Sequence, residues 1–259
     1  MPLHQRFTLH FTHLPLVQRV LYTCALFVLG LGYAFAMIHI YSSHHGRDGE
    51  QMLSVEDIVI AYSGNKEGTK LESALKGPMS GMLPADENVA LINWARNGAS
   101  QVEYEAGIKA IFDNRCIACH NNRNPHLPPL EDFEGVKHTA EEDHGADLFT
   151  LVRVSHIHLF GLTFIFFIVG SIFIHAYVRS EWVKITIIVT PFIAIALDIA
   201  SWYITKVSEP FAWVVIGSGA LMGLSFAFQF LVSIHQMWFY RLPDEVEQTF
   251  YCAPIDNKD

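Results

Sequence analysis

The segment RCIACH, residues 115–120, holds three side chains that can bind a metal or react as nucleophiles. Cys116 and Cys119 are separated by two residues, and His120 follows the second cysteine directly. Three chemistries use such a cluster: covalent attachment of a haem, coordination of zinc, and a redox-active disulfide. The compartment helps to separate them, because thiols stay reduced in the cytosol and are oxidised outside it.

Four apolar runs indicate which compartments the chain can reach. The chain has 259 residues, and 51% of them are hydrophobic. A helix needs about 20 mostly apolar residues to cross a bilayer, and each run is that long. Buried helices of a soluble protein would show a polar face at helical spacing, but FGLTFIFFIVGSIF and WVVIGSGALMGLSFAF show none. The runs cover residues 20–41, 159–178, 185–205 and 211–240.

Basic residues beside these runs predict the orientation, because such residues favour the cytoplasmic side. With four crossings, the basic clusters agree with both termini in the cytoplasm and residues 42–152 outside. In a bacterium, this orientation predicts that residues 42–152 form a periplasmic domain. Lys206, in the predicted outer link between the third and fourth runs, is the exception. The clusters are Arg6 with Arg19, Arg179 with Lys184, and Arg241.

The sequence therefore predicts an all-α protein, in which a small helical domain is inserted between the first two helices of a four-helix transmembrane bundle. In this insert, SVEDIVIAYSG is typical of a helix that begins with a capping box at Ser54 and Asp57. ADENVALINWARNGA is typical of a helix that ends at Gly98. Residues 64–84 are rich in turn formers, and residues 121–145 lack periodicity. The expected parts are a cytoplasmic N-terminus with the first membrane helix (1–41), the periplasmic domain (42–152), membrane helices two to four (153–240) and a cytoplasmic tail (241–259).

The charge of the insert limits its partners. Residues 42–152 contain 18 Asp and Glu against 9 Lys and Arg. No basic surface is indicated, which argues against a nucleic-acid partner. The segment also has little aliphatic content for about a hundred residues, so a bound group is expected to fill its core.

Covalent haem explains every part of the RCIACH cluster. Cys-x-x-Cys-His is the attachment signature of c-type haem. The two thiols add across the two vinyl groups of one porphyrin, and their spacing on a helical turn puts both sulfurs on one face. His120 can then reach the iron as the proximal ligand. One covalently bound haem c would also supply the missing core.

Two alternatives remain for the cysteines. Cys116, Cys119, His138 and His144 are spaced close to a Cys2His2 zinc pattern. That pattern leaves His120 without a role, and zinc thiolates suit a reducing compartment better than an outer face. A thioredoxin-like disulfide is expected within a βαβ unit, and the insert shows no such unit.

Two stretches resemble c-type cytochrome domains. YEAGIKAIFDNRCIACH, residues 104–120, looks like the first helix and attachment site of such a domain. MSGMLPADENVALINWARNGA, residues 79–99, is similar to the closing segment, which carries a methionine ligand and a tryptophan-containing helix. Here the second stretch precedes the first, as in a permuted domain. The resemblance implies a mono-haem cytochrome anchored in a bacterial inner membrane, which acts as a carrier or complex subunit of a respiratory or photosynthetic chain. Its partners would be other membrane redox subunits or soluble cytochromes.

The sixth iron position has several candidates. No methionine lies between His120 and the last membrane run, so a downstream methionine in the insert is excluded. Met82, close to Pro84, is the first choice, and Met79 is the second. A methionine ligand raises the reduction potential relative to a second histidine. The histidine alternatives are His126, His138 and His144.

Polar residues near the outer membrane surface suggest a second function. Asp198 and Trp202 lie one turn apart in the third run, and His156 and His158 lie at the outer entrance to the second. Ionisable residues inside a membrane are costly and are often functional. We expect Asp198 to face the bundle interior with one of these histidines. Such a group would suit oxidation of a quinol, although it could equally dock a partner subunit.

Two further hypotheses are less favoured. Bound b-haems would pair His39 with His158 and His175 with His235. His158 and His175 are 17 residues apart, so they point about 100° apart around one helix, whereas ligands of stacked haems should share a face. A haem-based sensor would need an output domain, for which the short inner tail leaves little room. No bond-making site is evident, which favours electron transfer over an enzyme acting alone.

Overall fold

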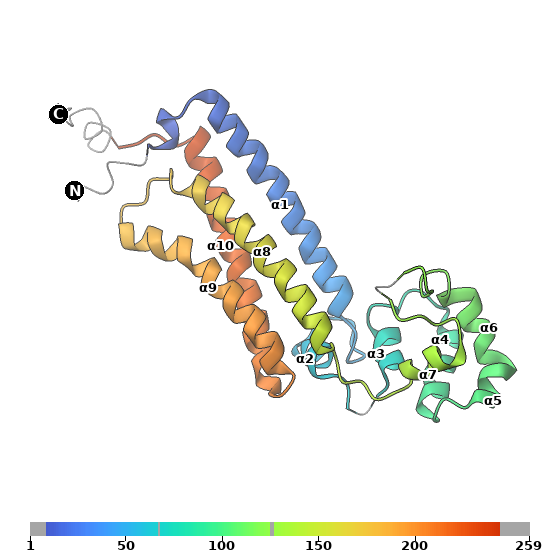
Figure 1. Cartoon of the computed structure of the whole chain (residues 1–259). Coiled ribbons are helices and arrows are strands. Elements are labelled where there is room, and N and C mark those ends of the chain that lie inside the picture. The colour runs from blue at the N-terminus through green and yellow to red at the C-terminus, as the bar shows by residue number, and fades with distance from the viewer. Residues whose placement is uncertain (1–8, 67, 125–126, 244–259) are drawn as a thin grey trace. The chain divides into compact units, whose positions relative to one another are not determined.

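The computed structural model describes residues 9–66, 68–124 and 127–243, and within these ranges it contains helices and no named strand (Figure 1). The predicted all-α class is therefore confirmed. Four helices are long and apolar enough to cross a membrane, as predicted, so the protein is a membrane protein in contact with lipid. They are α1 (Leu16–His44), α8 (Leu148–Phe173), α9 (Glu181–Thr205) and α10 (Ala212–Trp238).

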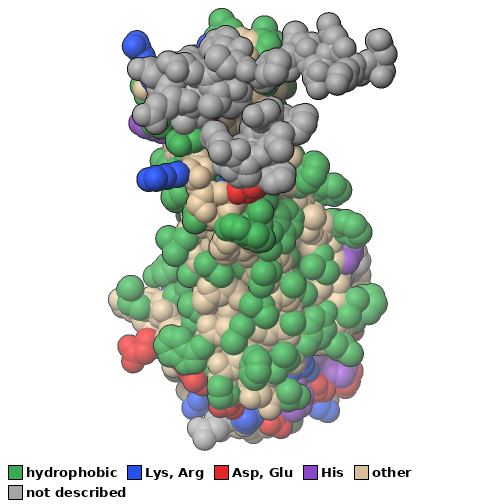
Figure 2. Space-filling view, turned by 90° about the vertical axis from the view of Figure 1, so that its left-hand side faces the viewer, with side chains coloured by type: hydrophobic (Ala, Val, Ile, Leu, Met, Phe, Trp, Pro, Cys, Tyr) green, Lys and Arg blue, Asp and Glu red, His purple; other side chains and the backbone are tan. Residues whose placement is uncertain are grey.

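The chain divides into two compact units. The bundle unit comprises Met1–Phe35, His156–Asp198 and Gly217–Asp259. The inserted unit comprises Ala36–Ser155 and Ile199–Ile216, so it includes the ends of all four membrane helices as well as the soluble segment. Hydrophobic side chains cover most of the visible face of the membrane helices (Figure 2), as expected for helices surrounded by lipid.

Small and aromatic residues bring α1 and α10 together in the bundle unit. The ring of Tyr33 stacks on Phe226 with centroids 4.8 Å apart. A methyl group at Gly223 would lie only 3.0 Å from the Tyr33 hydroxyl, which explains the glycine at this position. By contrast, Gly217 and Gly219 of the same helix face open space in the described chain.

A proline in α9 is compensated by a glutamine in α10. Pro191 lies inside α9 and has no N–H to donate to the carbonyl of Ile187, four residues earlier. The amide Nε2 of Gln229 donates to that carbonyl at 3.2 Å, and Gln229 is fully buried. A neighbouring helix thus satisfies the backbone group that the proline releases, as membrane interiors require.

Replacing Gln229 with leucine is expected to destabilise the protein by about 1 kcal/mol, because the Ile187 carbonyl loses its partner. In a Pro191→Ala background, residue 191 regains an N–H that can bond to this carbonyl. The same Gln229→Leu change should then cost much less. Thermal unfolding of the four variants in detergent measures the coupling. An equal loss of stability in both backgrounds would show that Gln229 does not act through Ile187.

Basic side chains cap the ends of membrane helices in the bundle unit. Arg19 donates from Nη1 to the carbonyl of Met237 at 3.2 Å, at the end of α10. Lys184 donates from Nζ to the carbonyl of Ala176 at 2.8 Å, just beyond α8. A cation at a helix C-terminus satisfies carbonyls that have no partner in the helix and interacts favourably with the helix dipole.

Lys206 is the one basic residue that disagrees with the predicted membrane orientation, and its contacts within the inserted unit explain why it is a lysine. Its Nζ donates to the carbonyls of Tyr62, His144 and Ala146 at 2.9, 2.9 and 2.6 Å. Burial lowers the pKa of this ammonium group. Lys206 therefore ties the end of α9 to the two chain segments beside it, which accounts for a cation at this position independently of membrane orientation.

Two predicted helices of the inserted unit are confirmed, and the capping box predicted at Ser54 and Asp57 begins α2. The helix that follows residue 84 ends near Gly98, which has a φ of +92° that favours glycine. Two short helices were not expected in the turn-rich and aperiodic stretches. They begin at the side-chain caps Thr69 and Asp132, respectively. The helices are α2 (Val55–Ser63), α3 (Lys70–Lys76), α4 (Ala85–Arg96) and α7 (Phe133–Thr139).

A buried carboxylate joins α3 to α4. Glu72 accepts two hydrogen bonds from Arg96, at 2.7 and 2.5 Å, and forms an ion pair with Lys76 at 2.8 Å. Burial would raise the pKa of Glu72, but these hydrogen bonds outweigh it and the pKa is lowered. The bonds between Glu72 and Arg96 hold α3 beside α4, and both helices pack into the apolar core of the inserted unit.

Candidate functional site

The cysteine cluster lies at the end of a helix assembled from short segments. In this helix the turn at residue 112 is wider than an α-turn, because the N–H of Ile117 bonds to the carbonyl of Phe112. The chain then makes one more turn, in which the N–H groups of Cys119 and His120 both bond to the carbonyl of Cys116. The segments are α5 (Gln101–Glu103), η3 (Tyr104–Ile108), α6 (Lys109–Ile111) and η4 (Phe112–Cys116).

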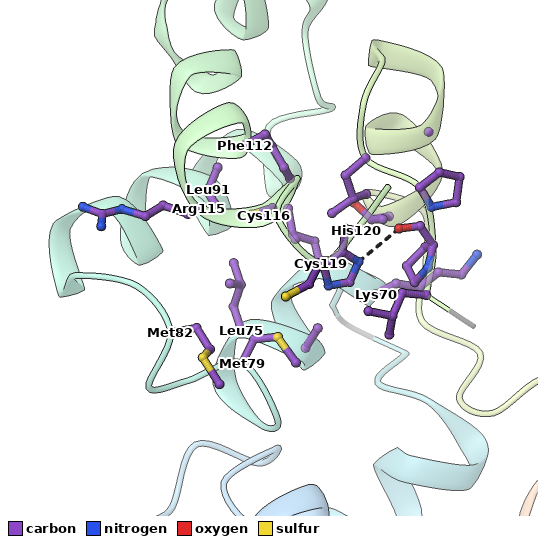
Figure 3. Close-up of a pocket in the computed structure, with 18 of the residues that line it drawn as sticks. Lys70, Leu75, Met79, Met82, Leu91, Phe112, Arg115, Cys116, Cys119 and His120 are labelled. Carbon is purple, nitrogen blue, oxygen red and sulfur yellow. Dashed lines mark hydrogen bonds between the residues drawn. The ribbon is translucent and has the colours of Figure 1, made fainter. Parts of the chain in front are cut away.

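This turn opens onto a cavity of about 600 Å³, within the range of small-molecule and cofactor sites (Figure 3). Its lining is mostly apolar and comes from α3, the loop after it, α4, η4 and the segment that leads into α7. Cys116, Cys119 and His120 all belong to the lining. The other lining residues important here are Leu75, Met79, Met82, Leu91, Phe112, Pro128 and Leu130.

The imidazole of His120 is oriented by a single hydrogen bond. Its Nδ1 lies 3.0 Å from the carbonyl oxygen of Pro128. Because a carbonyl only accepts, Nδ1 is the donor, and in the neutral imidazole Nε2 then keeps its lone pair. Metal-binding histidines characteristically donate their second ring nitrogen in this way, which fixes both the tautomer and the ring orientation. The His120 ring is therefore prepared to bind a metal through Nε2.

The two cysteines are free thiols and are not joined to each other. Cys116 is half-buried, whereas Cys119 is exposed. Burial, together with the negative charge of Glu87, raises the pKa of the Cys116 thiol. Redox-active Cys-x-x-Cys pairs have a lowered thiol pKa, so this environment does not support the disulfide alternative.

The side chains of the zinc alternative do not come together. Among the described residues, no three His, Cys, Asp or Glu side chains form a group that could hold a metal ion. His138 lines the cavity, but its Nδ1 pairs with Glu141 at 2.8 Å. His144 is exposed. His126, one of the alternative iron ligands, lies outside the described residues.

Both candidate methionines line the cavity, on the loop between α3 and α4. Met79 is partly buried and packs against the apolar core of the inserted unit. Met82 is 68% exposed. In the close-up, the Met79 side chain points toward Cys119 and His120, whereas Met82 points away from them (Figure 3). These observations favour Met79 over Met82, the first choice from the sequence.

The polar residues suggested for a quinol site differ in exposure. Asp198 and Trp202 are buried, with 7% and 6% of their surface exposed. His156 and His158 are exposed on α8. The expectation that Asp198 is shielded from lipid therefore holds, while its grouping with a histidine stays a prediction.

Two of the four histidines suggested as b-haem ligands, His175 and His235, have neighbours within the bundle unit. His175 donates from Nδ1 to the carbonyl of Leu9 at 2.7 Å and stacks against Tyr22. His235 lies against the rings of Phe239 and Tyr240. Each ring therefore has neighbours of its own near the end of a helix.

Sequence reasoning missed the residue that orients His120. Pro128 follows His120 by eight positions in the segment LPPL, which looked aperiodic. Prolines leave their carbonyls available while fixing the backbone, so paired prolines after a Cys-x-x-Cys-His turn could have suggested a second partner for the histidine.

Comparison with known proteins finds a family model that is similar to part of the chain. Residues 146–244, which contain α8, α9 and α10, match the model of a family described as a transmembrane helical domain. The match confirms the membrane character of these helices and lies outside the segment with the cysteine cluster. No curated protein and no solved structure matches the chain.

Proposed function

We propose that this protein is a membrane-anchored c-type cytochrome with one haem, and that it transfers electrons at the outer face of a bacterial inner membrane. The observation that carries the proposal is the His120–Pro128 hydrogen bond beside two cysteines in an apolar cavity. This set of residues meets the needs of covalent haem: two thiols, an imidazole with an available Nε2, and apolar walls.

Each residue has a separate task in this proposal. Cys116 and Cys119 would hold the haem by thioether bonds, His120 would bind its iron, and Pro128 would keep the imidazole in the required tautomer. When bound, the haem supplies a one-electron iron couple. Leu75, Leu91 and other apolar lining residues would exclude water from the haem. This lowers the reorganisation energy of electron transfer, because few solvent molecules have to reorient when the iron changes its charge.

The membrane helices anchor this domain and offer lipid-embedded surfaces to other subunits. Basic residues near the helix ends, such as Arg179 and Lys184, support an orientation with both termini in the cytoplasm and the haem domain in the periplasm. We infer that the electron partners are membrane redox subunits or soluble cytochromes. A quinol-oxidising subunit is the second candidate, supported by the burial of Asp198 within a membrane helix.

Spectroscopy of the full-length protein purified in detergent tests the proposal. We expect a c-type absorption spectrum, a low-spin iron with six ligands, and no spectral change when carbon monoxide is added. A spectrum without haem would contradict the proposal, and carbon monoxide binding would favour a sensor. Adding a reduced quinol separates the remaining candidates, because only a quinol-oxidising subunit should then reduce its own haem.

A further inference from the structure

The net charge of the chain is concentrated in the soluble segment. Residues 42–152 carry a net charge of −9, which equals the net charge of the whole chain. The positive and negative charges of the remaining residues therefore cancel. Among the described residues, six of the nine basic side chains in this segment are already paired with carboxylates. They are Lys66, Lys70, Lys76, Arg96, Lys109 and Arg115.

The mouth of the cavity has the composition of a protein interface. Four lining residues are both exposed and apolar: Met82, Cys119, Pro128 and Pro129. We call these four residues the cavity mouth. Protein interfaces typically have an apolar centre surrounded by a polar rim. Exposed apolar side chains around a buried redox group allow a partner to approach closely without leaving charges desolvated.

Exposed acidic residues flank the segments that line the cavity, and we call them the acidic rim. Arg115, which lines the cavity, is neutralised by Glu87 through hydrogen bonds of 2.8 and 3.1 Å. Lys70, on another wall, is neutralised by Glu141 at 2.9 Å. The acids that flank the lining segments and are exposed include Asp86, Glu131, Asp132, Glu134 and Glu142.

Two exposed bases offset these acids. Lys137, in α7, lies with its ammonium group over the ring of Phe133, at 5.9 Å from the centroid. Arg123 lies between Cys119 and Pro128 in the chain. The five exposed acids outweigh these two positive charges. The carboxylate groups that a haem itself carries would add to the negative potential.

We propose that the cavity mouth is the docking surface for a redox protein whose own electron-transfer face is basic, rich in lysine or arginine. This inference rests on the proposed haem function. One electron passes between the haem iron and the metal centre of the partner: the donor is oxidised, the acceptor is reduced, and no other bond or proton changes. Complementary charge would steer the two proteins together, so association should be fast at low salt and slow at high salt.

Two small oxidants of opposite charge test the local potential at the cavity mouth. Full-length protein in detergent is reduced and then mixed with tris(phenanthroline)cobalt(III), a cation, or with ferricyanide, an anion. We expect added salt to slow oxidation by the cation and to speed oxidation by the anion. The variant Asp86→Lys/Glu134→Lys should lower the cation-to-anion rate ratio by on the order of tenfold.

A matched control separates the rim from the overall charge. Glu103 and Glu105 are exposed on the same unit, but Glu103 lies nine residues before the nearest lining residue of its helix, a distance of about 13 Å. Glu103→Lys/Glu105→Lys changes the net charge equally and should alter the ratio much less. An equal effect of both variants would overturn the proposal, because only the total charge would then matter.

A protein probe completes the test. A soluble cytochrome c with a lysine-rich face should exchange electrons faster than an acidic copper protein, and the rim variant should reverse this order. Faster electron exchange with the acidic copper protein would indicate a partner with an acidic face and would refute the proposal. Haem content and the absorption spectrum are measured first in every variant. Absence of haem from the unmodified protein would refute the proposed function, whereas normal haem without charge dependence would refute only the docking surface.

Discussion

Replacement of both Cys116 and Cys119 by alanine is expected to abolish covalent haem completely. Each thiol supplies one thioether bond, and no other cysteine lines the cavity in the described chain. The denatured wild-type polypeptide should keep a haem stain on a gel and give a c-type pyridine haemochrome spectrum. The double variant should show neither, because without thioether bonds any haem that enters the cavity is lost on denaturation.

Cys24 provides the matched control for this experiment. It lies in α1 and is exposed, so Cys24→Ala should retain the full haem stain. The single variants Cys116→Ala and Cys119→Ala should each keep a weaker attachment through the remaining thioether. A stain that survives the double replacement would end the assignment of covalent haem, and a stain lost with Cys24→Ala would point to a failure of membrane insertion.

The sequence predicted the large features because their physical signals are long or chemically specific. Runs of about 20 apolar residues have few structural solutions other than a membrane helix, and all four runs form such helices. The Ser54–Asp57 box and Gly98 marked helix ends because each supplies a specific backbone interaction or conformation. Such local signals do not depend on which segments meet in the folded chain.

The short helices and the histidine partner escaped prediction because they depend on tertiary contacts. Each of α3 and α7 has seven residues, too few for a periodic pattern, and is stabilised by a cap and by packing. Pro128 contacts His120 because its segment of chain lies beside the cysteine turn, where the N–H of Leu130 donates to the carbonyl of His120. The choice between Met79 and Met82 likewise depends on how deeply each side chain is buried. The two methionines lie three positions apart in one loop, so the sequence does not show which of them is buried.

Met79→Ala is expected to remove the sixth iron ligand. Met79 lines the cavity, packs against the apolar core and points toward Cys119 and His120 (Figure 3). Without its thioether, the reduced iron should become five-coordinate and high-spin and should bind carbon monoxide. The reduction potential should also fall, because a thioether ligand favours reduced iron. Absorption spectra with and without carbon monoxide, together with a redox titration, measure these changes.

Met82→Ala is the comparison that makes this result specific. Met82 belongs to the same loop and the same cavity but is 68% exposed and points away from His120. Its removal should leave spin state and carbon monoxide binding unchanged, since an exposed thioether in water is easily displaced from a metal and is poorly held in place. Met79→His should restore six coordination with a lower potential than the wild type. If Met82→Ala alone produces the five-coordinate spectrum, the ligand is Met82; if neither variant does, the sixth position belongs to another residue, and the burial of Met79 reflects packing only.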